Sequence, residues 1–159
     1  MPFSALLYLY KAFVLPLLIY CAVVWAPYNA CYTSRLEKFQ RRITRVLMYR
    51  KQCSGEHVEY TDRLSEFGLL SVDDLFKFQR LQFCFKLLND IGPASFMDFF
   101  HRSRISQDRF LHWRARTNSF YNSVFVSFPR LWENIPLHTR QASSLPKFKF
   151  LSKQYFLTS

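Results

Sequence analysis

Apolar and charged positions separate most clearly over residues 35–47, "RLEKFQRRITRVL". On an α-helix that turns about 100° per residue, this stretch divides into two neighbouring arcs. The apolar arc contains Leu36, Phe39, Ile43, Val46 and Leu47. The basic arc contains Arg35, Lys38, Arg41, Arg42 and Arg45. We therefore expect a helix that docks on a core through the apolar arc and presents the basic arc outward.

The start of this helix has two possible signals. Ser34 followed three residues later by Glu37 forms a capping box, but the helix can also begin a turn earlier, near Asn29. Upstream, residues 4–25 predict a first helix that kinks at Pro16. Within it, residues 12–26 are uncharged and apolar, which predicts a completely buried helix.

A second strong helical pattern follows Ser71, which is placed to cap a helix over residues 72–90. Its apolar residues recur at helical spacing and mark it as a core helix: Leu75, Phe78, Leu81, Phe85 and Leu88, widened by Phe76, Phe83, Cys84 and Leu87. Shorter helices are expected around residues 60–67, 95–101 and 126–136, and a last one after Ser144. Residues 101–124 are poorly periodic, which indicates a loop-rich segment with room for a short hairpin.

These elements predict a mainly α protein, a small helical bundle with a loop-rich basic C-terminal segment. Its three parts are an N-terminal helical pair, a linker with the core helix, and the basic segment: residues 1–50, 51–100 and 101–159. Composition agrees, because half of the 159 residues are hydrophobic, 18 are Phe and only 3 are Gly. Such a chain can bury a core, and we expect one compact unit.

Charge adds information about the partner. The net charge of +11 divides into +6 for residues 1–50, −3 for 51–100 and +8 for 101–159. Such asymmetry favours a nucleic acid or an anionic membrane surface as partner. Glu37 is the only acid among residues 1–50, so the cations of the basic arc repel one another. A polyanion contact is therefore favoured over plain solvation of that arc, which stays open as the alternative.

The sequence contains no catalytic motif that we can identify. Phosphate-binding glycine loops, the nucleophile elbow and the zinc-protease pattern are all missing from it. Cys53 and His57 have a ligand-like spacing, but no second pair completes a metal site. Asp73 and Asp74 are explained by a helix N-terminus rather than by catalysis. We predict no catalytic residue, no metal site and reduced, mostly buried thiols in an intracellular protein, cytoplasmic or nuclear.

Basic residues alternate with aromatic ones at three places in the C-terminal third: Arg109–Phe110, His112–Trp113–Arg114 and Lys147–Phe148–Lys149. Cations neutralise phosphates, and exposed aromatic rings stack on unpaired bases. Arg114, Arg116, Lys147 and Lys149 are therefore candidate nucleic-acid contacts. The aromatic residues can equally be buried with only the charges exposed, and for Trp132 burial is the expected state.

Taken in order, these segments resemble the region after the polymerase core of LINE-type (non-LTR) retrotransposon reverse transcriptases, Jockey-like ones in particular. The resemblance is carried by "YKAFVLPLLIYCAVVWAP", "RLEKFQRRITRVL", "RLSEFGLLSVDDLFKFQRLQFCFKLLND" and the closing stretch from "RARTNSF" through "LWENIP" to "ASSLPKFKF". It covers about residues 6–156, and four motifs in order are more specific than any one alone. Glu133 departs from the pattern, which usually has Asn there.

The resemblance implies the thumb and post-thumb region of an RNA-directed DNA polymerase. A thumb holds the primer–template by its backbone, so Arg35, Lys38, Arg41, Arg42 and Arg45 are implied phosphate contacts. Partners would be an RNA–DNA or DNA duplex, element RNA, and the rest of the reverse transcriptase. Magnesium belongs to the palm, which would lie upstream, so we expect no cofactor and no polymerase activity on this chain alone.

The alternative is a small basic membrane-anchored protein. Residues 5–26 would span the bilayer and the basic arc would lie on anionic headgroups. The two hypotheses differ in the surroundings of Tyr20 and Trp25. These side chains pack against the core helix in the reverse-transcriptase hypothesis and face lipid in the membrane-anchor hypothesis.

Overall fold

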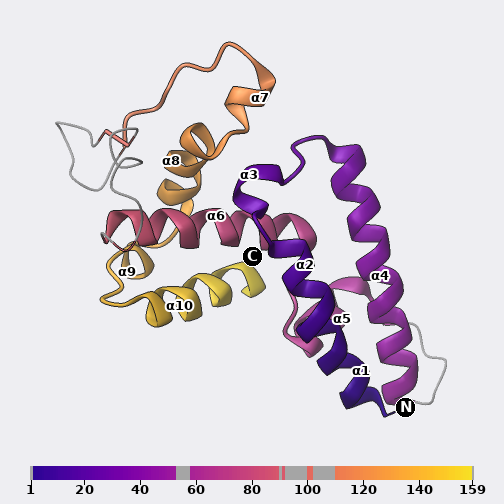
Figure 1. The fold of residues 1–159 in the computed structure, drawn as a ribbon. Coiled ribbons are helices and arrows are strands. Elements are labelled where there is room, and N and C mark those ends of the chain that lie inside the picture. The colour runs from indigo at the N-terminus through magenta and orange to yellow at the C-terminus, as the bar shows by residue number, and fades with distance from the viewer. Residues whose placement is uncertain (1, 53–57, 90, 92–99, 102–109, 159) are drawn as a thin grey trace. The chain divides into compact units, whose positions relative to one another are not determined.

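The computed structural model describes residues 2–52, 58–89, 91, 100–101 and 110–158, and their regular elements are helices (Figure 1). In chain order they are α1 (Phe3–Leu9), the π-helical turn η1 (Tyr10–Val14), α2 (Leu15–Ile19), α3 (Ala22–Trp25), α4 (Ala30–Gln52), α5 (Tyr60–Phe67), α6 (Val72–Leu88), α7 (Asn118–Tyr121), α8 (Val124–Asn134), α9 (Leu137–Arg140) and α10 (Leu145–Thr158). The predicted class, a mainly α helical bundle, is confirmed. The helix expected at residues 95–101 falls almost entirely outside the described residues.

The chain divides into two compact units. The first contains Met1–Ala22 and Ala26–Phe76, and the second contains Val23–Trp25 and Lys77–Ser159. The core helix α6 was expected over residues 72–90 and is observed over Val72–Leu88. It contributes its first residues to one unit and the rest to the other.

The N-terminal helix is interrupted, contrary to the single kinked helix predicted over residues 4–25. Proline has no amide hydrogen, so Pro16 cannot continue the regular hydrogen-bond ladder. The backbone widens just before it, where the amide of Leu15 donates to the carbonyl of Tyr10 five residues back. A second break follows at Cys21, which has a left-handed φ of 51°. These two breaks divide the stretch into α1, η1, α2 and α3.

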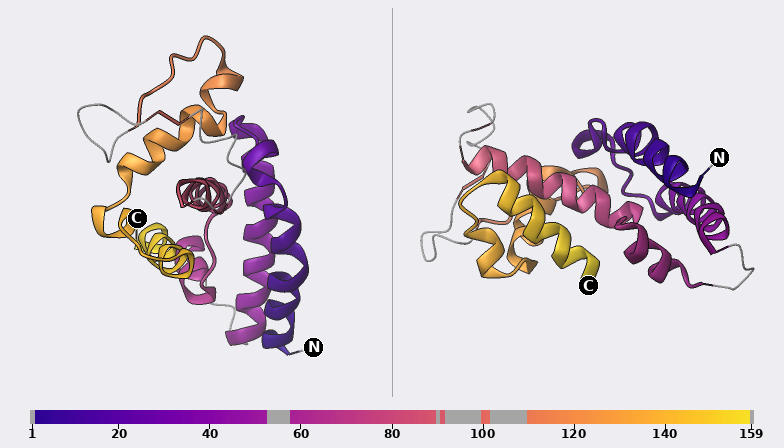
Figure 2. Two further views of the ribbon diagram at one scale, coloured as in Figure 1. Left: turned by 60° about the vertical axis from the view of Figure 1, so that its left-hand side comes forward. Right: turned by 90° about the horizontal axis from the view of Figure 1, so that it is seen from below.

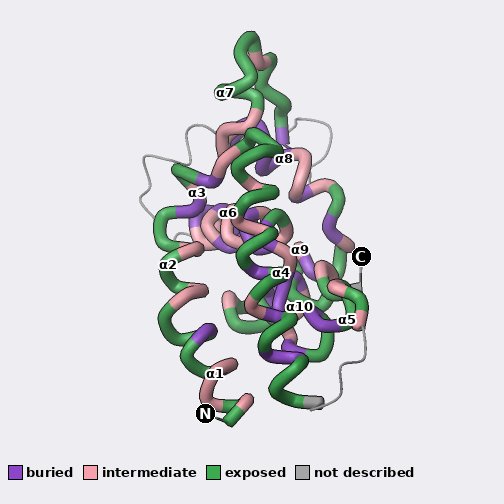
Figure 3. Tube along the Cα trace, turned by 90° about the vertical axis from the view of Figure 1, so that its right-hand side faces the viewer, coloured by how far each residue is buried: buried purple, intermediate pink, exposed green. Residues whose placement is uncertain are grey.

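The predicted burial of residues 12–26 is also wrong. Only Ala22 and Ala26 are buried in this stretch, while Phe13, Leu17 and Val24 are exposed, Leu17 by 76%. Figure 3 draws α2 in the colours of exposed and intermediate residues throughout. Periodicity identified this stretch as apolar. It could not show which of the apolar side chains would stay exposed. In the part of the chain that the structure describes, no helix has the length and apolarity needed to cross a membrane.

In the first unit, α1 lies alongside α4, and α4 contacts α5 (Figure 2). Their shared core contains Tyr10, Leu47, Met48, Leu64, Phe67 and Leu69. A smaller cluster joins the turn after α3 to the start of α6 and contains Ala22, Ala26, Val72 and Phe76, with Leu36 packed against it. Together these clusters bury one side of α4 and leave the other exposed.

Local signals in the sequence set the ends of α5 and α6. Gly68 has a φ of 61°, a conformation that glycine adopts without strain, and it ends α5. The amide of Leu69 then donates to the carbonyl of Leu64 at 2.8 Å, which completes the C-terminal cap. Ser71 caps α6 as predicted, since its Oγ accepts from the amide of Asp74 at 3.2 Å.

The core of the second unit is aromatic. Residues of α6, α8 and α10 meet in it, and Phe148 of α10 is completely buried there. Its ring stacks on Phe85 with ring centroids 4.1 Å apart and on Trp132 with centroids 6.0 Å apart. The predicted burial of Trp132 is confirmed, and α6 is the expected core helix.

Candidate nucleic-acid interface

Helix α4 presents all five predicted phosphate contacts, Arg35, Lys38, Arg41, Arg42 and Arg45, as exposed side chains. It begins at the earlier of the two predicted positions, because Oδ1 of Asn29 accepts from the amide of Cys31 at 3.1 Å. Buried and exposed positions recur along the helix in Figure 3.

The buried side of α4 coincides only in part with the predicted apolar arc, since Leu47 is completely buried and Leu36 and Ile43 pack against core clusters. Phe39 and Val46 were expected in the core, but both are exposed. Gln40 and Thr44 are completely buried instead. Gln40 is stabilised there because its Nε2 donates to the carbonyl of Leu70 at 2.6 Å and its Oε1 accepts from the Tyr10 hydroxyl at 3.2 Å. Satisfied polar groups can occupy a core, and hydrophobic periodicity alone does not predict this.

The single acid of α4, Glu37, is held in hydrogen bonds to the two helices that follow. Oε2 of Glu37 accepts from the amide of Val72 at 2.8 Å, at the start of α6. Its Oε1 accepts from the hydroxyl of Tyr60 on α5. Glu37 therefore connects α4 with the next two helices, and the exposed side of α4 carries cations without an acid of its own.

Two of the five cations lie beside α5. The Arg41 guanidinium lies over the Tyr60 ring, 4.7 Å from its centroid. The Arg63 guanidinium lies 5.7 Å from the same centroid. Arg45 is close enough to Arg63 for its charge to lower the pKa of that group. Arg42 points about 100° away from Arg41 and about 60° away from Arg45 around the helix axis, so it lies at the edge of this group.

Burial and charge shift the pKa values of several groups around α4. Burial, assisted by the charge of Glu37, raises the pKa of Tyr10 to about 12. Burial, then the hydrogen bond to Glu37, also raises the pKa of Tyr60. Burial, then the charge of Arg45, lowers the pKa of Arg63, while nearby Glu59 acts in the opposite direction. Both tyrosines therefore stay neutral at physiological pH.

In the second unit, the predicted contacts Arg114, Arg116, Lys147 and Lys149 are exposed. The aromatic residues next to them divide into two kinds. Phe110 and Phe148 are buried core residues, so they cannot stack on a base. Trp113 is 43% exposed, and its ring centroid lies 5.9 Å from that of His101. Of the three alternating stretches, only the one at Trp113 presents an aromatic ring to solvent; Arg109 lies outside the described residues.

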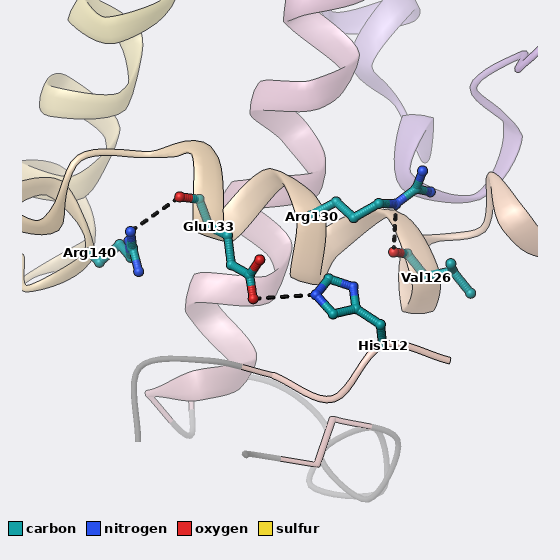
Figure 4. Close-up of polar contacts among 5 residues, drawn as sticks. All are labelled: His112, Val126, Arg130, Glu133 and Arg140. Carbon is teal, nitrogen blue, oxygen red and sulfur yellow. Dashed lines mark hydrogen bonds and ion pairs between the residues drawn. The ribbon is translucent and has the colours of Figure 1, made fainter. Parts of the chain in front are cut away.

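Several other basic groups of the second unit serve its internal structure (Figure 4). Nε of Arg140 donates to the carbonyl of Ile135 at 2.9 Å. Arg130 lies over the Tyr121 ring at 3.9 Å and donates to that residue's carbonyl at 2.7 Å. His112 contacts Glu133, with Nε2 and Oε1 3.3 Å apart. Sequence alone cannot separate such structural cations from those that remain available to a ligand.

In the part of the chain that the structure describes, metal and thiol chemistry add no further site. Among the described residues, no three His, Cys, Asp or Glu side chains gather in a metal-binding arrangement. The Cys53–His57 pair lies outside those residues. Cys84 is buried, which raises the pKa of its thiol, but Cys21 and Cys31 are exposed, so the expectation of mostly buried thiols is wrong for these two.

No family model, curated protein or solved structure matches this chain. The functional interpretation therefore depends on the residues themselves. The sequence did not predict that Tyr60 and Arg63 belong to this interface, or that Glu37 connects α4 to the next two helices. Tyr60 and Arg63 lie three residues apart, as neighbours on a helix face do, but their position beside Arg41 depends on the packing of α5 on α4.

Proposed function

We propose that this chain is the thumb and C-terminal region of a LINE-type reverse transcriptase, and that α4 binds the phosphate backbone of a primer–template. Four sequence motifs in family order support the assignment. The mainly helical fold is compatible with it. The contacts would be to RNA–DNA or DNA duplex and would carry no base specificity.

One observation carries the proposal. The exposed side of α4 presents five cations over eleven residues, and the only acid of the helix is held in two hydrogen bonds on the inner side. Surfaces that are merely solvated usually mix both signs of charge, because like charges repel. A phosphate backbone would offset this repulsion and release its own counterions.

The basic residues of the second unit extend the proposal to unpaired strands. Arg114 and Arg116 follow the exposed ring of Trp113 along the chain. Such an arrangement can neutralise a strand while the ring stacks on a base. Lys147 and Lys149 project from α10 on either side of buried Phe148, where they can make phosphate contacts only.

Binding to recessed duplexes of unrelated sequence tests the proposal. We expect affinities that agree within about threefold among RNA–DNA duplexes of equal length, since backbone contacts carry no sequence information. Replacing the five basic-arc cations of α4 with Gln should abolish duplex binding, whereas Lys86→Gln/Lys153→Gln, in the second unit, should weaken it only slightly. Sequence preference above about tenfold, or binding that survives the five substitutions, would contradict the proposal.

An anionic membrane surface is the second candidate, and a specific observation favours it. Leu9, Phe13, Leu17 and Tyr20 are exposed at near-helical spacing along α1, η1 and α2. Exposed apolar rows can bury themselves at a lipid interface while nearby cations contact headgroups. Partition onto vesicles with and without anionic lipid tests this candidate, and Leu17→Glu should reduce partition if it holds.

A further inference from the structure

The contact between α4 and α5 gathers more positive charge than the helix surface alone provides. Arg41 and Arg45 lie one turn apart on α4, and Arg63 approaches them from α5. The Arg41 and Arg63 guanidinium groups share the Tyr60 ring, with their Cζ atoms 4.7 and 5.7 Å from its centroid.

Arg63 is unusual for a cation because only 6% of its surface is exposed. Its Nη1 donates to the carbonyl of Val58 at 2.7 Å. Its Nε is buried and has no hydrogen-bond partner among the described residues. A buried charge is costly unless an opposite charge or further hydrogen bonds compensate for it.

The neighbouring acids compensate for this charge only in part. Glu59, an exposed residue just before α5, is a carboxylate whose charge favours the charged form of Arg63. Glu37 is held by hydrogen bonds from Tyr60 and from the amide of Val72, and its charge acts on Tyr60. The two neighbouring carboxylates thus balance the positive charge of the three guanidinium groups only in part.

Tyr60 holds two of these groups in position. Its hydroxyl is anchored by Glu37, and its ring faces both Arg41 and Arg63. Guanidinium groups that stack on a fixed ring keep their N–H groups in a limited range of directions. Such preorganisation distinguishes a discrete site from a row of mobile surface cations.

We propose that Arg41, Arg45 and Arg63 form a discrete phosphate-binding site, which holds one phosphodiester of the bound nucleic-acid strand. This inference rests on the proposed function and deepens it, since it assigns one fixed anchoring point on a backbone that the other cations contact loosely. Arg63 supplies a binding role that the sequence pattern did not indicate. The same chemistry could accept a free phosphate or a lipid headgroup, and the test separates these sources.

The first arm of the test titrates wild-type protein with inorganic phosphate at constant ionic strength, with NMR detection of the arginine Nε–H signals. We expect saturable shifts of the Arg63 signal, with a dissociation constant of about 1 mM. Arg45→Gln should weaken this binding at least about fivefold, because it removes a charged partner. Arg50→Gln is the matched control: Arg50 is exposed on the same helix and is not among the proposed contacts, so the same charge change there should leave phosphate binding within about twofold of wild type.

Arg63→Lys supplies the second variant, since it keeps the charge and removes the planar fork. It should weaken phosphate binding, whereas a purely structural arginine would leave binding in the folded variant unchanged. If Arg63→Lys does not fold, the comparison of Arg45→Gln with Arg50→Gln still decides. Arginine signal shifts that do not saturate with phosphate, or equal losses of phosphate affinity in these two variants, would refute the proposed site.

The second arm measures binding of Arg45→Gln and of Arg42→Gln, which removes another proposed backbone contact of α4, to a recessed RNA–DNA duplex and to anionic phospholipid vesicles. Stronger loss of duplex affinity in Arg45→Gln than in Arg42→Gln supports the assignment to a nucleic-acid strand. Equal losses, without saturable phosphate binding, would leave the proposed function intact and refute the discrete site. Saturable phosphate binding by a protein that binds vesicles and no duplex would refute both the assignment to a strand and the proposed function.

Discussion

The hydroxyl of Tyr60 donates a hydrogen bond to Oε1 of Glu37, while the other oxygen of that carboxylate accepts from the amide of Val72 at 2.8 Å. One side chain thus joins α4, α5 and the start of α6. It also removes the only acid of α4 from the surface that we assign to phosphate binding. Structure and proposed function therefore depend on the same residue.

Replacing Glu37 with Gln should lower the free energy of unfolding by about 1–3 kcal/mol, because hydrogen bonds to a charged acceptor are stronger than those to a neutral one. Urea unfolding measures the change. Asp62→Asn is the matched control, since Asp62 is exposed and surface substitutions usually stay within about 0.5 kcal/mol. Equal effects of the two substitutions would show that the inward position of Glu37 contributes no stability.

The buried polar pair of Tyr10 and Gln40 gives a second prediction. Gln40→Leu should cost about 2–3 kcal/mol, since it leaves the Leu70 carbonyl and the Tyr10 hydroxyl buried without their partner. Tyr10→Phe in the same chain should recover at least about 0.5 kcal/mol of that loss relative to additivity. A double-mutant cycle by chemical unfolding measures this coupling, and strict additivity would argue against the hydrogen bond.

Alkaline pH should destabilise the protein through Tyr10. Its pKa is raised from 10.0 to about 12 in the folded state, so the unfolded chain loses this proton first as pH rises. The tyrosine's contribution is complete below pH 10 and is lost between about pH 10 and 12, roughly 2–3 kcal/mol in all. Tyr10→Phe should lack this part of the pH dependence when unfolding is followed across that range. An unchanged profile in the variant would contradict the shift.

Two phenylalanines of α10 test the finding that Phe148, between Lys147 and Lys149, is a core residue and does not stack on a base. Phe148→Ala should cost about 3–5 kcal/mol, because Phe148 fills the aromatic core. Phe150→Ala, on the same helix but 62% exposed, should cost less than about 1 kcal/mol. Thermal or urea unfolding measures both. A small effect at Phe148 would mean that its ring lies outside the core and remains available to a base.

Periodicity and local capping signals predicted the helical class and most helix positions, because they depend on neighbouring residues. Ser71, Gly68 and Asn29 are examples in which a side chain or backbone conformation acts within one turn. The rotation of α4 was not predictable, since Gln40 enters the core only because Leu70 and Tyr10 supply partners from distant segments. The hydrophobic run of residues 12–26 likewise gave no sign of which side would stay exposed.

The candidate site shows the same division. The five cations of the basic arc were identified from helical spacing, and the structure places them on the exposed side of α4. Arg63 was missed, because its approach to Arg45 and to the Tyr60 ring depends on the packing of α5. Phe110 and Phe148 were proposed as possible stacking residues, but tertiary packing buries them.

The salt dependence of duplex binding tests the central claim most directly. Wild-type protein and the variant Arg41→Ala/Arg42→Ala/Arg45→Ala would be titrated with salt on a recessed RNA–DNA duplex. If these arginines contact phosphates, the log–log slope should fall by roughly 2–3 in the variant, about 0.9 for each lost contact. An unchanged slope, or wild-type protein that binds anionic vesicles but no duplex, would contradict phosphate-backbone binding by α4.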